Sequence, residues 1–372
     1  MITSDKAAIR AVAEQIAAPF LAANAMPVEA DILQPAETLL DLYGEDIRAR
    51  AYVTNDPLRG ELMMRPDFTV PVVQMHMETG AEPARYTYLG EVFRKQDHET
   101  GRANEYLQVG FELFDPTDAA AADAEVFALF QKALSPFDLG LRAATGDIGI
   151  LLAVVDSLST SDRRRAALRR HLWRPRRFRA LLDRFGGRRA APESRVKLLE
   201  AVGTSGVEAI LDQAGPEIGL RSREDVAARV AALVDDAAQD PLSAGELEIM
   251  NHILSIRETS DNALEQLRDV AVDMPAIEPA VAQLGRRLDA LSARGVDVSE
   301  LDFEASYGRT TLEYYDGFVF GFYAADRPDL PSVATGGRYD ALTRVLGGGR
   351  SIPAVGGVAR PEVITTLQEA RS

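Results

Sequence analysis

Apolar residues recur at helical spacing near the start of the chain, at Ile9, Val12, Ile16 and Phe20. Residues three and four apart share one side of an α-helix, so this spacing predicts an amphipathic helix that ends near residue 23. The same criterion predicts further helices at about 70–78, 118–134 and 148–158, and a last helix after residue 360.

A period of two replaces the helical period in the stretches 84–94 and 104–114, which a polar, glycine-containing segment separates. Two such stretches predict an antiparallel β-hairpin. On its second arm Gln108, Gly110 and Glu112 share one face, because side chains alternate along a strand. A polar face is unusual for a buried strand, so we expect it to form the floor of a pocket. Shorter strands are predicted at 51–53, 61–64, 141–147 and 301–303, with a second hairpin at 311–323.

The segment 161–271 differs in character, because it is charged, follows helical periodicity and has no alternating stretch. We interpret it as a helical insertion domain. The predicted fold is therefore of the α+β class, with a core built from residues 1–160 and 272–372.

The insertion begins with a basic segment, in which residues 163–189 contain twelve arginines and one acid, Asp183. Three interpretations stay open for this segment: a solvated helical face, a contact with an acidic partner subunit, or a nucleic-acid surface. The net charge of −16 opposes the third, and Trp173 and Phe178 are too few for a base-stacking platform.

Composition narrows the possible chemistry. The 372 residues, 46% hydrophobic and 26% charged, are typical of a globular protein, and the absence of cysteine excludes disulfides and thiolate chemistry. Four scattered histidines have no metal-ligand spacing, so we expect neither a metal nor a cofactor. The start of the chain lacks the order of a signal peptide, and the apolar run 148–155 is too short for a bilayer. These features predict a cytoplasmic protein without membrane contact.

Several segments together resemble the catalytic domain of histidyl-tRNA synthetase, a class II aminoacyl-tRNA synthetase. They occur in the order of that family: Arg65-Pro66-Asp67-Phe68-Thr69, Phe93-Arg94, Glu105-Tyr106-Leu107-Gln108-Val109-Gly110-Phe111-Glu112, Leu312-Glu313-Tyr314-Tyr315, Gly336-Gly337-Arg338-Tyr339-Asp340 and Pro353-Ala354-Val355-Gly356. The resemblance implies a class II synthetase-like antiparallel sheet flanked by helices, in addition to the helical insertion.

The chain departs from the synthetase pattern where that family has arginines. Thr310, Val363 and Asn104 occupy these positions in ungapped alignment. Loss of cations that stabilise a phosphoryl transition state would cost about 3 kcal/mol each. The chain also has no room for an anticodon-binding domain after the last motif. The resemblance therefore implies a protein without aminoacylation activity and without catalytic residues of its own.

The amino-acid pocket of the family is retained in this sequence. By resemblance, the residues that would bind histidine are Asp67, Thr69, Arg94, Gln108, Glu112, Tyr315 and Tyr339. The first two and Gln108 would hold the α-ammonium group, and Arg94 would hold the carboxylate. Glu112 and Tyr315 would hold the imidazole, with Tyr339 nearby.

A pocket without the arginines is characteristic of the regulatory subunit of ATP phosphoribosyltransferase, a paralogue of the synthetase. The resemblance implies activation of a short catalytic subunit in the first step of histidine biosynthesis, with feedback inhibition by histidine. It also implies a dimer of this chain within a hetero-octamer. Two alternatives stay open: a histidine-activating, adenylate-forming enzyme, and a free-standing sensor of histidine or RNA.

Overall fold

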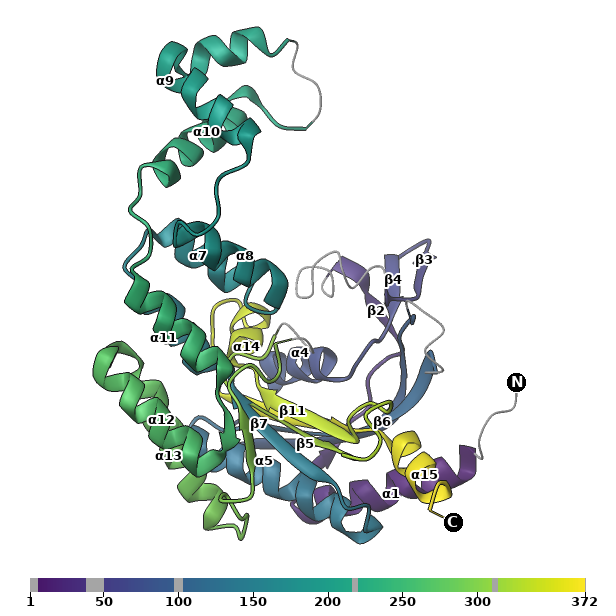
Figure 1. Cartoon of the computed structure of the whole chain (residues 1–372). Coiled ribbons are helices and arrows are strands. Elements are labelled where there is room, and N and C mark those ends of the chain that lie inside the picture. The colour runs from purple at the N-terminus through teal and green to yellow at the C-terminus, as the bar shows by residue number, and fades with distance from the viewer. Residues whose placement is uncertain (1–5, 38–49, 97–102, 216–219, 310–313, 372) are drawn as a thin grey trace. The chain divides into compact units, whose positions relative to one another are not determined.

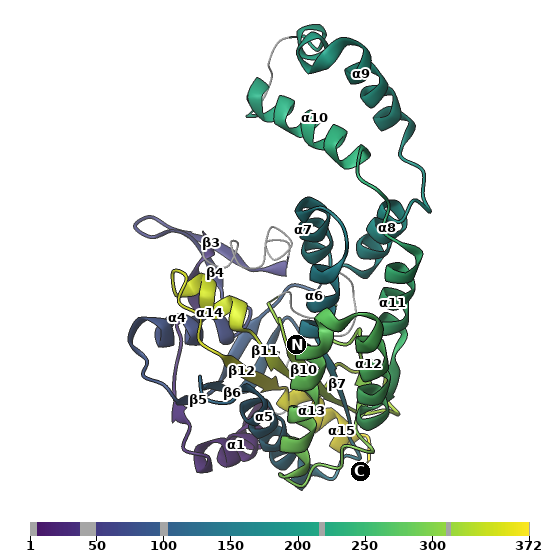
Figure 2. The ribbon, with the colours of Figure 1, turned by 90° about the vertical axis from the view of Figure 1, so that its left-hand side faces the viewer.

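The structure is a computed structural model that describes residues 6–37, 50–96, 103–215, 220–309 and 314–371 (Figures 1 and 2). The chain divides into two compact units. The first consists of Met1–Leu151 and Leu254–Ser372, and the second of Leu152–Ile253. The second unit thus starts and ends earlier than the predicted insertion, 161–271. The second unit ends earlier because helix α12, Ser260–Asp273, packs against strands β8 and β9 and helix α13 of the first unit.

A nine-stranded sheet forms the centre of the first unit, in the order β1-β5-β6-β12-β11-β10-β7-β9-β8. All neighbouring strands are antiparallel except the pairs β1–β5 and β7–β9. The strands are β1 (Met26–Pro27), β5 (Ala84–Phe93), β6 (Glu105–Phe114), β7 (Arg142–Asp147), β8 (Arg257–Thr259), β9 (Asp302–Glu304), β10 (Phe318–Tyr323), β11 (Ala334–Arg338) and β12 (Ala354–Ala359). The α+β class and the predominantly antiparallel sheet are confirmed.

The predicted hairpin of β5 and β6 is present, since Ala84 pairs with Phe114 and Phe93 with Glu105. The second predicted hairpin, 311–323, is not seen among the described residues. Strand β10 pairs with β7 and β11 instead. Residues 310–313 lie outside the described part, and Tyr314 to Gly317 form no strand. The backbone N–H of Asp316 donates to the Arg338 carbonyl, which directs this segment to the end of β11. Strand β8 also corrects the expectation that 161–271 is free of strands.

Helices cover the two faces of the sheet differently (Figure 1). Helix α1 (Lys6–Ala22) and helix α5 (Ala119–Leu134) pack on the face that carries Phe111, whose ring lies 5.5 Å from Phe20. Helix α13 (Glu278–Ser292) packs on α5, and helix α15 (Pro361–Glu369) packs on α1 and β6. The opposite face, with Gln108 and Glu112, meets helix α4 (Thr69–Thr79), which contacts helix α14 (Asp340–Leu346). A separate sheet contains β2 (Leu33–Pro35), β4 (Gly60–Met64) and β3 (Val53–Asp56).

Buried ion pairs join these helices to the sheet. Asp123 of α5, 0% exposed, accepts hydrogen bonds from Arg287 Nε at 2.8 Å and Arg338 Nη2 at 2.7 Å. Arg287 also donates to Asp147 Oδ2 at 2.7 Å, and Arg338 donates to Asp340 Oδ1 at 3.1 Å. One carboxylate thus connects α5, α13 and the end of β11.

The second unit is helical. It contains α7 (Asp162–Arg170), α8 (Pro175–Phe185), α9 (Glu193–Gln213) and α10 (Arg223–Ala237), while α6 (Ile148–Ser157) and α11 (Ala244–Ser255) cross its limits. Asp236 accepts hydrogen bonds from Arg164 Nε at 2.7 Å and Arg195 Nη2 at 2.6 Å, which ties α7, α9 and α10 together. No helix in the described ranges is long and apolar enough to cross a membrane.

Candidate functional site

Glu112 lies on the polar face of β6 and is 0% exposed. Its carboxylate accepts three hydroxyl donors. Thr69 Oγ1 and Tyr88 OH each donate to Oε1 at 2.9 Å, and Tyr339 OH donates to Oε2 at 2.5 Å. Because a carboxylate has about four acceptor positions, Oε1 is fully used and Oε2 retains one position for a further donor.

The sequence brings these groups together through strand register and short connections. Thr69 is the first residue of α4, and Tyr339 follows β11 directly. Gly356 of β12 pairs with Glu112, and a Cβ atom at Gly356 would lie 1.6 Å from Glu112 Oε2. Glycine is therefore required at residue 356 for the carboxylate to occupy its place.

Burial raises the pKa of Glu112 to about 7, and the negative charge of Asp67 acts in the same direction. The hydrogen bonds from Tyr339, Tyr88 and Thr69 oppose this rise, since they stabilise the ionised form. The carboxyl is thus held in a buried environment where a small change in its surroundings alters its charge near neutral pH.

This raised pKa predicts a pH-dependent stability. Between its ordinary pKa of 4.5 and about 7, Glu112 is ionised in the unfolded chain but protonated in the folded protein. Its contribution to the free energy of unfolding therefore falls as pH rises. Replacing Glu112 with glutamine removes this contribution, so the variant should gain stability relative to the wild type from about pH 5 to about pH 8. Urea unfolding across this range measures the difference, and a difference that stays constant with pH contradicts the prediction.

Gln108 lies four residues before Glu112 on the same face of β6 and is 1% exposed. Neither its amide nitrogen nor its amide oxygen has a hydrogen-bond partner among the residues that the structure describes. An unsatisfied buried amide is costly, by about 1–3 kcal/mol. Such a group is therefore suited to bind a polar group of a ligand.

Asp67 and Arg94 form a second pair of predicted residues. The Arg94 Nη2 atom lies 3.8 Å from Asp67 Oδ2, and Arg94 Nε donates to the Pro66 carbonyl at 2.7 Å. Asp67 is 3% exposed, and its Oδ1 accepts the Val70 N–H at 3.5 Å. The site thus contains a carboxylate and a guanidinium, whose charges are complementary to the two charged ends of an amino acid.

Tyr315 is 5% exposed, and its ring packs edge-on against Tyr314 at 4.9 Å. Burial raises the pKa of its phenol, and the charges of Glu112 and Asp67 raise it further. The phenol therefore lies within electrostatic reach of both carboxylates. Thr69 and Tyr339 donate hydrogen bonds to Glu112 directly, whereas the contact of Tyr315 with Glu112 is electrostatic.

Sequence reasoning missed Tyr88. The Tyr88 ring stacks on Phe68 at 4.4 Å and covers Gly110, where a Cβ atom would lie 2.0 Å from the ring. Alternation along β5 places Tyr86, Tyr88 and Gly90 on one face. It does not reveal which tyrosine reaches Glu112, because Tyr88 pairs with Gly110 and contacts Glu112 diagonally.

The positions where the sequence departs from the synthetase pattern are only partly described. Thr310 lies outside the described residues. Val363 is 7% exposed within α15, and the Asn104 carbonyl accepts the Arg94 backbone N–H at 2.8 Å. Arg360 lies just before α15 and donates to the Ser332 carbonyl at 2.8 Å. Burial lowers the pKa of Arg360, and the charge of Arg94 acts in the same direction.

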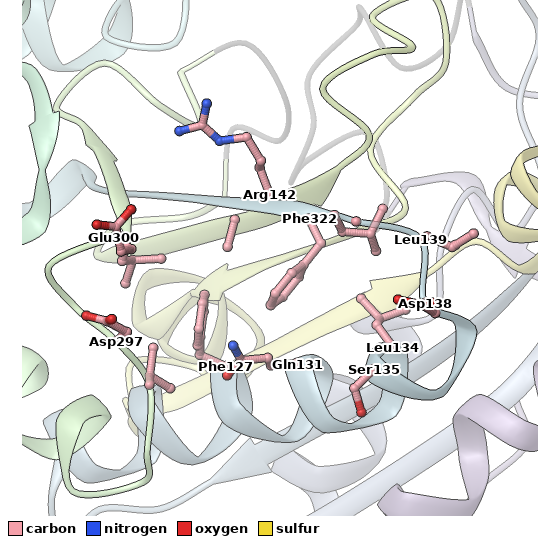
Figure 3. A pocket seen from close by; sticks show the side chains of 15 residues that line it. Phe127, Gln131, Leu134, Ser135, Asp138, Leu139, Arg142, Asp297, Glu300 and Phe322 are labelled. Atoms are coloured by element: carbon pink, nitrogen blue, oxygen red, sulfur yellow. The ribbon is translucent and has the colours of Figure 1, made fainter.

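A cavity of about 400 Å³ lies elsewhere in the first unit (Figure 3). Phe127 projects into it from α5 and Phe322 from β10, with Asp297 and Glu300 on one side and Asp138 on the other. It contains none of the seven predicted residues, and α5 places it on the opposite face of the sheet from Glu112. We assign the site to the Glu112 cluster, because several buried polar groups converge there. No group of three or more histidine or acidic residues in the described ranges could hold a metal ion.

The fold is that of class II aminoacyl-tRNA synthetases. A solved structure of an ATP phosphoribosyltransferase regulatory subunit/histidyl-tRNA synthetase from Bacillus halodurans C matches with a TM-score of 0.68 at 20% identity, over 99% of this chain and 81% of that one. A histidine–tRNA ligase subunit from Alicyclobacillus acidocaldarius matches with a TM-score of 0.62 at 22% identity, over 100% and 95% of the two chains.

Sequence comparison gives the family. The histidyl-tRNA synthetase family model matches residues 9–240 and 220–364. The ATP phosphoribosyltransferase regulatory subunits of Brucella canis and Brucella suis are each 33% identical over 342 residues, which cover 88% of this chain and 89% of each relative. The chain belongs to the family of ATP phosphoribosyltransferase regulatory subunits, within the histidyl-tRNA synthetase-like proteins.

Proposed function

We propose that this chain regulates ATP phosphoribosyltransferase in the first step of histidine biosynthesis. It acts in the cytoplasm, without catalytic residues or a cofactor of its own. It activates a short catalytic subunit and makes that subunit sensitive to feedback inhibition by histidine. The chain dimerises within a hetero-octamer, which native mass spectrometry of the two subunits mixed together tests.

The observation that carries the histidine site is the buried Gln108 amide beside the Glu112 cluster. Gln108 has no partner within the described ranges, although it is 1% exposed. A bound amino acid would satisfy it, because an α-ammonium group donates hydrogen bonds that the amide oxygen accepts. Asp67 and Thr69 lie on the same side of the sheet and would supply the other acceptors.

The ring of histidine suits the remaining position on Glu112. An imidazole N–H would donate to Oε2, the oxygen that Tyr339 leaves partly open. Tyr315, whose phenol lies within electrostatic reach of Glu112, would contact the other side of the ring. Arg94 would pair with the ligand carboxylate in a charge-assisted contact.

Regulation requires that histidine bind unequally to two arrangements of the assembly. A coupling free energy of about 1–3 kcal/mol is typical of such effects. The experiment is to measure phosphoribosyl-ATP formation by the short catalytic subunit, with and without this chain, while histidine is titrated. The expected result is activity that needs this chain and that histidine lowers.

Two results would replace this proposal. If the chain leaves the catalytic subunit unchanged but exchanges pyrophosphate into ATP in a histidine-dependent reaction, it is an adenylate-forming enzyme. If it binds histidine and does neither, it is a free-standing sensor.

Replacing Tyr88 with phenylalanine should weaken histidine binding by roughly 2- to 12-fold, because one hydrogen bond contributes about 0.5–1.5 kcal/mol. The ring and its stacking on Phe68 remain, so the fold should be unchanged. Calorimetric titration with histidine measures the effect. Tyr86→Phe is the matched control, because Tyr86 OH contacts His76 and not Glu112. Equal affinity of both variants would contradict a role for Tyr88 in the site.

A further inference from the structure

Eleven of the twelve arginines of the segment 163–189 fall into two groups in the structure, and Arg174 belongs to neither of them. One group makes contacts within the second unit. Its members are Arg164 with Asp236, Arg165 with Asp162, Arg169 with Asp156, Arg179 with Asn251, and Arg184 over the Phe185 ring. These arginines have a structural role that explains their presence.

The other group is exposed, and its side chains have no hydrogen-bond or ion-pair partner within the described part of the chain. Its members are Arg163, Arg170, Arg176, Arg177, Arg188 and Arg189. Arg163 and Arg170 are seven residues apart, so they lie on one side of α7. We call these six residues the exposed arginine group.

The residues in the first turn of α8 do not stabilise the helix. Arg176 and Arg177 occupy its first turn, which contains no acid, and the preceding Arg174 makes no side-chain cap. The positive end of the helix dipole repels cations at this point, whereas acids or a capping oxygen would stabilise it. A local conflict of this kind between sequence and structure is expected where a residue serves binding.

We propose that the exposed arginine group is an interaction surface for an acidic protein, the catalytic subunit of the assembly proposed above. This inference rests on the proposed function. Trp173 is half-buried between Arg170 and Arg176 in the sequence, and tryptophan and arginine are the residues most enriched at the centres of protein interfaces. A negatively charged surface would neutralise the arginines and offset the repulsion at the start of α8.

Nucleic acid fits this surface less well. Phe178 is 1% exposed and Phe185 is 3% exposed, so neither ring is available for a base to stack on. The net charge of −16 also opposes a polyanion over the rest of the chain.

The test uses the full chain with Arg176→Glu and Arg177→Glu combined. The matched control is Arg221→Glu with Arg229→Glu, since both residues are exposed, belong to the same unit and make no ion pair within the described ranges. Surface plasmon resonance measures binding to the short catalytic subunit at low and high ionic strength. We expect the α8 variant to bind at least about 10-fold more weakly and to lose most of the salt dependence, and the control to bind like the wild type.

Unchanged assembly in the α8 variant would overturn the surface while leaving the proposed function intact. If the same variant also binds RNA more weakly than the wild type, the arginines bind nucleic acid instead. A wild-type chain that does not bind the catalytic subunit would instead overturn the proposed function, and the surface with it. Circular dichroism of both variants verifies that the helices are retained.

Discussion

Replacing Glu112 with glutamine weakens histidine binding by roughly 10- to 150-fold, because a hydrogen bond to a charged group contributes about 1.5–3 kcal/mol. The substitution keeps the size of the side chain but removes the charge that an imidazole N–H would meet. It also offers an amide N–H to the Tyr88, Tyr339 and Thr69 hydroxyls, which now donate to the carboxylate. The expected result is that feedback inhibition of the catalytic subunit shifts to higher histidine concentration by the same factor.

Glu105→Gln is the matched control for this prediction. Glu105 begins the same strand, but it is exposed and lies near Lys6 at 3.3 Å. The control should bind histidine like the wild type, and activation of the catalytic subunit without histidine should be retained in both variants. Unchanged inhibition in Glu112→Gln would place the effector site elsewhere, even if the chain remains an activator.

The second large effect is expected at Asp123. Replacing it with alanine leaves the guanidinium groups of Arg287 and Arg338 without their shared carboxylate in the interior. Removing one partner of a buried ion pair typically destabilises a protein by about 3–5 kcal/mol. Chemical denaturation, followed by circular dichroism, measures the loss.

Glu125→Ala gives a matched comparison on the same helix, two residues away. Its partner Arg85 lies 2.7 Å away, but both side chains are 28% exposed. Pairs near the surface contribute about 0–1 kcal/mol, so this variant should lose little. A similar loss in both variants would show that the buried network does not stabilise the core.

Much of the fold and site follows from local pattern. Strict alternation predicts the β5–β6 hairpin, and the polar face of β6 distinguishes Gln108 and Glu112 on the basis of the amino-acid sequence alone. Local pattern does not report which strands meet from distant parts of the chain. For this reason the diagonal contact of Tyr88 and the place of Gly356 beside Glu112 could not be predicted.

The limits of the insertion illustrate the same restriction. Helix α12 has an amphipathic sequence like those of the second unit, and only its packing on β8, β9 and α13 assigns it to the core. The hairpin predicted at Asp316-Gly317 was wrong for the described residues, because Asp316 serves another purpose. Its carboxylate accepts hydrogen bonds from the backbone N–H groups of Asp340 and Ala341 at 2.9 and 2.7 Å. Asp316 therefore connects its own segment to the start of α14 and does not form a hairpin turn.

The place of β12 in the sheet has a consequence for biosynthesis. Strand β12 lies between β6 and β11, so Phe114 pairs with Ala354. The ribosome therefore synthesises β5, β6 and the whole second unit before it synthesises β12, the strand that pairs with β6. At a synthesis rate of about 5–20 residues per second, the edge of β6 that later pairs with β12 stays unpaired for more than about ten seconds. During that interval it is exposed to pairing with other chains, so newly made protein should depend on chaperones more than its final stability suggests.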